Sequence, residues 1–132
     1  MTGPGSTTPQ LHKLGIVPGT RWSVVDADPG WRFETAPDTA GEVPKSAPAD
    51  LVLVFVRAAA ELEPALVEHE QRVFPAGSLW IAWPRKAAGH VSDLGDSVVR
   101  EAALSRRLVD VKVAALDHDW SALKLVWRRE RR

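Results

Sequence analysis

The feature that most constrains the fold is an unbroken apolar run over residues 51–56, which reads LVLVFV. A strand with one face in water alternates apolar and polar residues, so a run without alternation predicts a strand buried on both faces. Such strands belong to parallel sheets that are covered on both sides. The run is also far shorter than the roughly 20 apolar residues of a membrane-spanning helix, and we expect no membrane span.

Predicted helices and strands alternate after this run. Residues 58–73 carry apolar side chains at helical spacing, and Pro64 is placed to start the main helix or to kink its first turn. Residues 78–83 (SLWIAW) predict a second buried strand, closed by Pro84 because proline cannot donate to a strand ladder. The spacing over 93–108 predicts a second amphipathic helix.

The end of the chain predicts an antiparallel hairpin. Residues 109–116 and 122–127 are strand-like, and the short polar segment DHDWS separates them. Strand–helix alternation before this hairpin implies parallel pairing with right-handed crossovers. The expected class is therefore a Rossmann-like, three-layer α/β sandwich with a mostly parallel sheet and a C-terminal antiparallel hairpin.

The first third of the chain is less regular. Residues 10–14 predict one helical turn that stops at Gly15, and residues 21–27 predict the first strand. Residues 28–50 hold four prolines and predict a long loop, with a short edge strand allowed over 31–35. We expect a disordered tail over 1–9, a single domain over 10–128 and a basic tail over 129–132, a division that fits the 132-residue length.

Composition removes several function classes. The chain has no Cys, which excludes a thiolate nucleophile, a redox pair and a thiolate zinc site. Seventeen basic and 17 acidic residues cancel, so we do not expect nucleic acid as a partner even with the arginine-rich tail. The first ten residues lack the charged and apolar regions of a secretory signal, and the expected compartment is the cytoplasm.

Two segments resemble class I S-adenosylmethionine-dependent methyltransferases, which have a Rossmann-like fold. They are PGTR at 18–21, leading into a strand that ends at Asp26, and the whole stretch 50–127. The resemblance implies that the last strand inserts between the strands at 78–83 and 109–116. The Gly-rich cofactor loop of that family is replaced by ADPGW at 27–31, and the 23 residues between Ala27 and Leu51 are too few for that family's cofactor half. The resemblance therefore implies a truncated cofactor half, and we expect no bound cofactor.

The chain also resembles a bacterial family known as domain of unknown function 3052. This resemblance covers most of 11–128 and implies a fold and a bacterial cytoplasmic setting, but no activity. The matching segments are KLGI with the following PG, residues 50–57, LWIAWPRK at 79–86, residues 89–93, 98–101 and 109–113, and DWS at 119–121 with Lys124.

Ligands of open α/β sheets bind outside the carboxyl ends of the parallel strands. Arg85 and Lys86 also precede a predicted helix, whose free N–H groups favour an anion. The alternative is that both are solvated loop charges and that Asp93 or Asp96 caps the helix. The predicted ligand-binding residues are Asp26, Arg57, Trp83, Arg85, Lys86, His90, Asp93 and Trp120.

Other chemistry-bearing residues receive simpler interpretations. The three residues 117–119 (DHD) are ligand types, but a hairpin tip explains them better than a metal site, and we expect no metal. His69 is placed on a solvated helix face. Among six tryptophans, Trp31, Trp83 and Trp120 lie at strand ends or turns, where they would line an apolar pocket if they gather. The other three are placed in the core or on a sheet face.

The leading hypothesis is a non-catalytic Rossmann-like module that binds a small anionic ligand or a protein partner. One alternative is a small atypical transferase-like enzyme that uses Asp26, Lys86 and Asp93 around one pocket at the carboxyl edge of the sheet. The other alternative is a purely structural interaction domain. The residues do not identify a ligand, a reaction or an oligomeric state.

Overall fold

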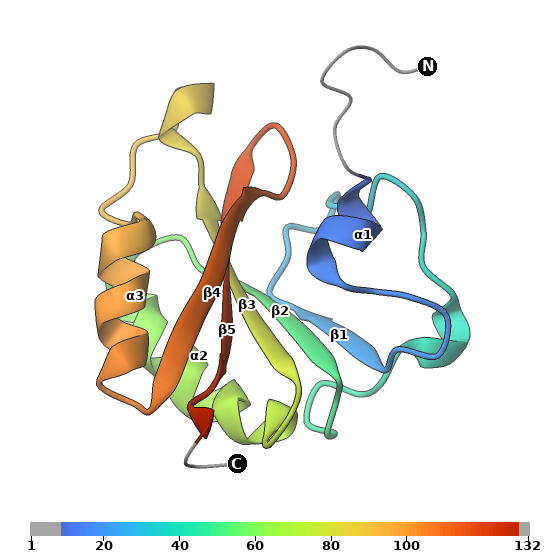
Figure 1. The fold of residues 1–132 in the computed structure, drawn as a ribbon. Coiled ribbons are helices and arrows are strands. Elements are labelled where there is room, and N and C mark those ends of the chain that lie inside the picture. Colours follow the sequence, from blue (N-terminus) through green and yellow to red (C-terminus); the bar gives the residue numbers. More distant parts are fainter. Residues whose placement is uncertain (1–8, 130–132) are drawn as a thin grey trace.

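A computed structural model describes residues 9–129. The predicted disordered tail, except for Pro9, lies outside these residues, as does the end of the predicted basic tail, 130–132. The described part forms one five-stranded sheet between two covering layers (Figure 1). No helix within it is long and apolar enough to cross a membrane.

The sheet has the order β1-β2-β3-β5-β4. Strands β1 (Trp22–Val25), β2 (Leu51–Phe55) and β3 (Ser78–Pro84) are parallel. Strand β5 (Trp120–Trp127) lies between β3 and β4 (Leu108–Ala115) and is antiparallel to both. The predicted fold class, the hairpin and the insertion of the last strand are all confirmed.

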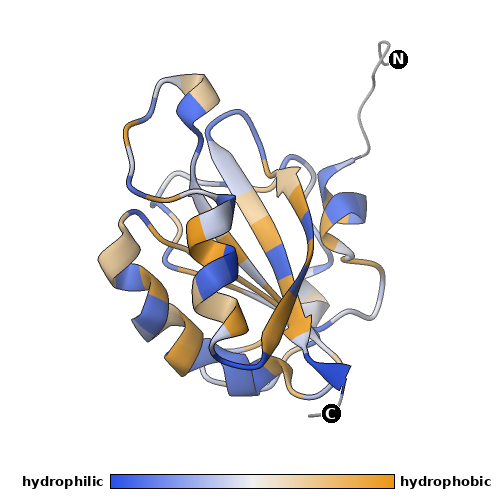
Figure 2. Ribbon diagram, turned by 60° about the vertical axis from the view of Figure 1, so that its left-hand side comes forward, coloured by the Kyte–Doolittle hydropathy of each residue, from blue (hydrophilic) through white to orange (hydrophobic). Residues whose placement is uncertain are grey.

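Two helices cover one face of the sheet, as Figure 1 shows. They are α2 (Leu62–His69), flanked by the 3-10 turns η2 (Ala59–Glu61) and η3 (Glu70–Val73), and α3 (Asp96–Leu104). In Figure 2 both helices carry hydrophobic and hydrophilic bands, as expected for helices that pack on one side only. Their inward residues meet an aliphatic core, which includes Leu66, Val52, Val54, Leu79, Ile81, Val99 and Ala103.

The opposite face is covered by the short helix α1 (Gln10–Leu14) and by the long loop over 28–50, which contains the 3-10 turn η1 (Thr39–Gly41). Helix α1 ends as predicted, because Gly15 adopts the left-handed conformation (φ 90°) that glycine tolerates best. Gly41 has a different role, since a Cβ there would overlap the Thr20 carbonyl oxygen. The covering layers on the two faces are therefore of different kinds.

The short edge strand allowed over 31–35 does not form, and this prediction was wrong. The side chains of Trp31 and Phe33 instead turn onto the sheet, where the two rings lie 4.9 Å apart. The β1 edge makes an isolated bridge further along the loop, where the Val43 N–H donates to the Trp22 carbonyl at 2.9 Å. Packing of these two partly buried rings on the sheet face thus takes the place of strand pairing over 31–35.

Three further expectations need correction. The helix predicted over 58–73 is divided into η2, α2 and η3, and the one over 93–108 shortens to α3 because β4 already begins at Leu108. His69 does not lie on a solvated face, since it is only 1% exposed. Its Nδ1 lies 3.1 Å from Nη1 of Arg72, which itself donates to the carbonyls of Ala47 and Pro44.

Candidate functional site

The carboxyl ends of β1, β2 and β3 meet at one edge of the sheet. Asp26 follows β1, Arg57 follows β2 and Arg85 follows β3. The antiparallel strand β5 starts at the same edge, because Trp120 is the register partner of Pro84. The topology therefore gathers polar side chains from four segments that are far apart in the sequence.

A cavity of about 350 Å³ opens at this edge. It is open to solvent and combines charged groups with one buried aromatic ring, since Trp120 is 7% exposed. We call it the carboxyl-edge cavity. Its lining residues are Asp28, Arg57, Pro84, His90, Asp119 and Trp120.

Arg57 is fixed on one side of this cavity. Its Nη2 donates to the Asp26 carbonyl and to Oδ1 of Asp28, both at 2.7 Å. The guanidinium carbon lies 5.4 Å from the centre of the Trp120 ring, within cation–π range. Within residues 9–129, Nε and Nη1 of Arg57 make no hydrogen bond. The side chain is thus held in place while three of its N–H donors stay available.

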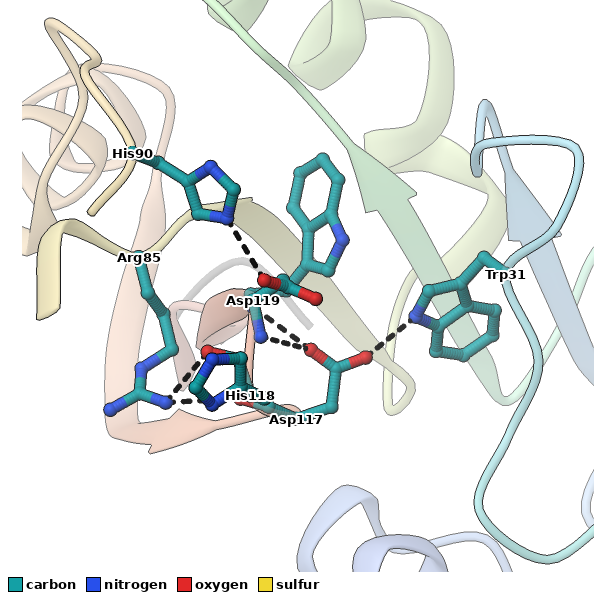
Figure 3. Close-up of polar contacts among 7 residues, drawn as sticks. Trp31, Arg85, His90, Asp117, His118 and Asp119 are labelled. Atoms are coloured by element: carbon teal, nitrogen blue, oxygen red, sulfur yellow. Dashed lines mark hydrogen bonds and ion pairs between the residues drawn. The ribbon is translucent and has the colours of Figure 1, made fainter. Parts of the chain in front are cut away.

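His90 and Asp119 face each other on another side. Nε2 of His90 lies 3.0 Å from Oδ1 of Asp119, and both side chains are partly exposed. His90 belongs to the loop after β3, and Asp119 belongs to the β4–β5 turn (Figure 3). The pair therefore joins the loop to the hairpin across the cavity.

The β4–β5 turn is held by its own backbone and by its neighbours (Figure 3). Oδ1 of Asp117 accepts from the N–H groups of Asp119 and Trp120, both at 2.9 Å, and its Oδ2 accepts from the Trp31 indole at 2.9 Å. Nη1 of Arg85 donates to the carbonyl of Asp117 at 3.3 Å and to that of the next residue at 2.8 Å. These contacts explain why a DHD sequence forms a hairpin tip here.

Three of the eight predicted ligand-binding residues line the cavity together: Arg57, His90 and Trp120. Arg85 lies close by but donates to the hairpin carbonyls. The remaining four are placed elsewhere and are described next.

Asp26 has a left-handed backbone (φ 63°) and lies 3.7 Å from Nζ of Lys45, at a neighbouring cavity beside α2. Trp83 is 5% exposed and packs in the aliphatic core, so it does not join Trp31 and Trp120. Lys86 is exposed in the 3-10 turn η4 (Lys86–Ala88).

Asp93 does not cap α3. Its Oδ1 accepts the Ala59 N–H at 2.8 Å, which ties the loop before α3 to the turn after β2. The residue that precedes α3 is Gly95, which has no side chain to cap it, and Asp96 in the first turn pairs with Arg100 at 3.4 Å. Arg85, which was predicted to join an anion site at this helix end, donates instead to the hairpin carbonyls.

The eight predicted ligand-binding residues do not include Asp28, Pro84 or Asp119, which also line the cavity. Asp28 reads as the start of a turn, and Asp119 as part of a hairpin tip. A signal was nevertheless present, because each follows or precedes a strand at the same edge. The sequence pattern did not reveal that Arg57 pairs with Asp28 or that His90 pairs with Asp119.

Two features of this edge bear on metal and dinucleotide binding. Within residues 9–129, no three His, Cys, Asp or Glu side chains converge in a way that would hold a metal ion. The loop after β1 is occupied by Trp31, whose ring lies 5.0 Å from Phe55 in an edge-to-face arrangement.

Comparison with solved structures agrees with this fold. A protein of the NADB-Rossmann superfamily from Streptococcus agalactiae matches with a TM-score of 0.54 and 10% identity, covering 97% of this chain and 71% of that one. The tRNA methyltransferase TrmK of B. subtilis has a TM-score of 0.42 and 15% identity, covering 67% of this chain and 36% of that one. No family model and no curated protein matches the chain. At 10% identity, the match to the Streptococcus agalactiae protein shows the fold alone.

Proposed function

We propose that the protein is a non-catalytic Rossmann-like module that binds a small ligand at the carboxyl-edge cavity. The ligand carries an anionic group for Arg57 and a flat or apolar part for Trp120. The observation that carries this proposal is the fixed guanidinium, which is held through Nη2 and has Nε and Nη1 unbonded within residues 9–129. Its support by Asp28 reduces the ordering cost of ligand binding.

The chemistry of the cavity favours one anionic group over several. Two carboxylates, Asp28 and Asp119, line it, but each already pairs with a basic side chain, Arg57 and His90 respectively. An incoming carboxylate or phosphate can accept a charge-assisted hydrogen bond from Nε or from Nη1 of the arginine, since Nη2 is already used. A ligand with several charges would instead meet the two carboxylates.

The transferase-like alternative has less support in the geometry. Its three residues do not share the carboxyl-edge cavity: Asp26 lies beside Lys45, Asp93 accepts from Ala59, and Lys86 is in an exposed turn. The interaction-domain alternative depends on the β4 edge, where Val111 and Val113 are about half exposed. The register of that strand shifts between Asp110 and Lys112, and such bulges hinder edge-to-edge pairing.

Membership of the bacterial 3052 family remains part of this proposal, with the cytoplasmic setting that it implies. The support is the run of matching segments, of which LWIAWPRK at 79–86 and DWS at 119–121 both reach the carboxyl-edge cavity. The family supplies no ligand, so the ligand must be found by experiment.

The test is a calorimetric and thermal-shift screen of the full chain against nucleotides, S-adenosylmethionine and acyl phosphates. A ligand at about one hundred times its Kd stabilises a folded protein by roughly 2.7 kcal/mol, enough to raise Tm clearly. Arg57→Gln should then weaken binding at least about tenfold, since hydrogen bonds to charged groups contribute roughly 1.5–3 kcal/mol.

The matched control is Arg100→Gln. Arg100 is another partly exposed arginine that is paired with an aspartate, Asp110, but it lies in α3, outside the cavity. It should leave the affinity unchanged. The proposal fails if no compound in the screen shifts Tm, or if both arginine variants bind as the wild type does.

A further inference from the structure

Two lysines lie side by side on the C-terminal strands of the sheet, on the face that carries α1. Lys112 of β4 and Lys124 of β5 are direct register partners, and Lys124 is in turn the partner of Trp80 in β3. Nζ of Lys112 lies 5.9 Å from the centre of the Trp80 ring. All three side chains therefore project from the same face of three neighbouring strands.

This arrangement breaks a rule of sheet stability. Opposed residues in an antiparallel pair have Cβ atoms roughly 4.5–5.5 Å apart, and like charges there are destabilising. Within residues 9–129, neither Lys112 nor Lys124 forms an ion pair with a carboxylate. Figure 2 shows hydrophilic positions interrupting the otherwise hydrophobic C-terminal strands. Uncompensated local conflicts of this kind are most frequent at functional sites.

Lys124 also lines a cavity of about 380 Å³. The cavity lies between the end of α1, the turn over 15–20 and the amino ends of β2 and β3. It is therefore at the opposite end of the parallel strands from Arg57. Ser78 lines it too, and the Ser78 hydroxyl makes no hydrogen bond within residues 9–129. An ammonium group and a free hydroxyl thus face the same space.

The one carboxylate in this cavity is already neutralised. Asp50 accepts from the Arg21 backbone N–H at 2.9 Å and from the Arg21 guanidinium at 3.2 Å. The backbone hydrogen bond and then the side-chain hydrogen bond from Arg21 hold the pKa of Asp50 below its usual value. Asp50 therefore stays ionised and paired with Arg21, and it leaves the positive charge of Lys124 uncompensated.

We infer that Lys112, Lys124 and Ser78 form a second ligand site, which takes a phosphate-type oxyanion. The oxyanion relieves the repulsion between the two ammonium groups and accepts from the serine hydroxyl. Its source is either free phosphate or the phosphoryl group of a larger molecule. Lys13 extends the positive surface, with its Nζ fixed 3.0 Å from the Ala115 carbonyl on the same face.

The test is an NMR titration of the full chain with inorganic phosphate at constant ionic strength, with chloride as the balancing ion. Phosphate should shift the amide resonances of residues 110–114 and 122–126, with saturation below about 10 mM. Lys124→Gln should weaken this binding by at least about fivefold and Ser78→Ala by a smaller factor. In chloride alone, Lys112→Gln should raise Tm, because the like-charge contact is lost.

The matched control is Lys86→Gln, an exposed lysine in η4 that is outside this cavity. It should change neither the phosphate affinity nor the shift pattern. Arg57→Gln should also leave phosphate binding at this site intact, which separates the test from that of the carboxyl-edge cavity. A second titration with adenosine 5′-monophosphate, made on the Arg57→Gln variant and followed at residues 110–114 and 122–126, distinguishes the sources: tighter binding than phosphate identifies a phosphoryl group on a larger ligand, and equal or weaker binding identifies free phosphate.

Two results would overturn the inference. One is the absence of saturable shifts with either compound. The other is an unchanged phosphate affinity in the Lys112→Gln/Lys124→Gln double variant, which would mean that the shifts come from diffuse ion binding.

Discussion

The two faces of the sheet are built in different ways. On one face α2 and α3 supply regular helices over an aliphatic core. On the other, a five-residue helix and a loop cover a core rich in aromatic rings. Helices satisfy their own backbone groups, but an irregular layer must find partners for its N–H and C=O groups elsewhere.

On the loop face, tryptophan indoles provide two of those backbone partners and bind one carboxylate as well. The Trp22, Trp80 and Trp31 indoles donate to the Asp38 carbonyl, the Leu14 carbonyl and the Asp117 carboxylate at 3.2, 3.1 and 2.9 Å. Edge-to-face contacts also run from Trp31 to Phe55 and on to Trp120. An aromatic core with polar handles can therefore stabilise a layer that has little secondary structure.

The largest expected effect comes from Phe55, which is 1% exposed and contacts two tryptophans. Phe55→Ala should lower the free energy of unfolding by about 3–5 kcal/mol, and Leu66→Ala on the helix face by about 2–5 kcal/mol. Urea unfolding followed by tryptophan fluorescence and far-UV circular dichroism measures both. The exposed Val111→Ala should change stability by less than about 0.5 kcal/mol.

This experiment also tests whether the two faces unfold together. Fluorescence reports mainly the loop face, where most of the tryptophans lie, and circular dichroism reports the helices. We expect coincident transitions, because both layers pack on the same five strands. If the fluorescence transition comes at lower urea than the circular dichroism transition, the two layers do not unfold as one cooperative unit.

A smaller effect is expected at Gln10, a buried polar residue of α1. Its Nε2 donates to the Leu116 carbonyl, and its Oε1 accepts from the Glu34 N–H, both at 2.8 Å. Gln10→Ala leaves these two groups without partners and should cost about 1–3 kcal/mol. Hydrogen exchange should rise at Glu34 and around α1 but not in α3. His12→Ala, an exposed change in the same helix, is the control, and an equal effect of both variants would contradict this role.

The smallest effect is confined to a pH window and belongs to the helix face. Burial is the main cause that lowers the pKa of His69 from its ordinary 6.5, and the charge of Arg72 adds to it. The unfolded chain therefore binds a proton near pH 6.5, whereas the folded protein does so only at lower pH. The contribution of neutral His69 to the free energy of unfolding is therefore fully present above pH 6.5. It is lost as the pH falls from there through the lower pKa of the folded protein.

His69→Gln should remove that loss while keeping an acceptor for Arg72. Urea midpoints between pH about 7.5 and about 5 provide the measurement. His118→Gln, a change in the exposed hairpin tip, should leave the slope as it is in the wild type. If His69→Gln keeps the wild-type slope, the titrating group lies elsewhere.

The sequence predicted the framework well because its signals are local. The run at 51–56 has no polar position, so only a doubly covered strand fits it, and glycine or proline marks the ends of α1 and β3. Local patterns failed where a distant partner decided the outcome. His69 reads as a surface residue between two glutamates, and its burial beside Arg72 depends on the loop at 44–47.

The residues of the candidate site also fall into those that local sequence signals predicted and those that depend on distant partners. The rule on strand ends brought Arg57, His90 and Trp120 to one edge from the sequence, since parallel strands end on the same side. Only the tertiary structure decided that Trp83 turns to the helix face and that Asp28 fixes Arg57. Sequence by itself determined which segments are strands and where they end, because backbone preference and burial act locally. The structure decided which side chains meet, because contacts such as His90 with Asp119 join residues that only the fold brings together.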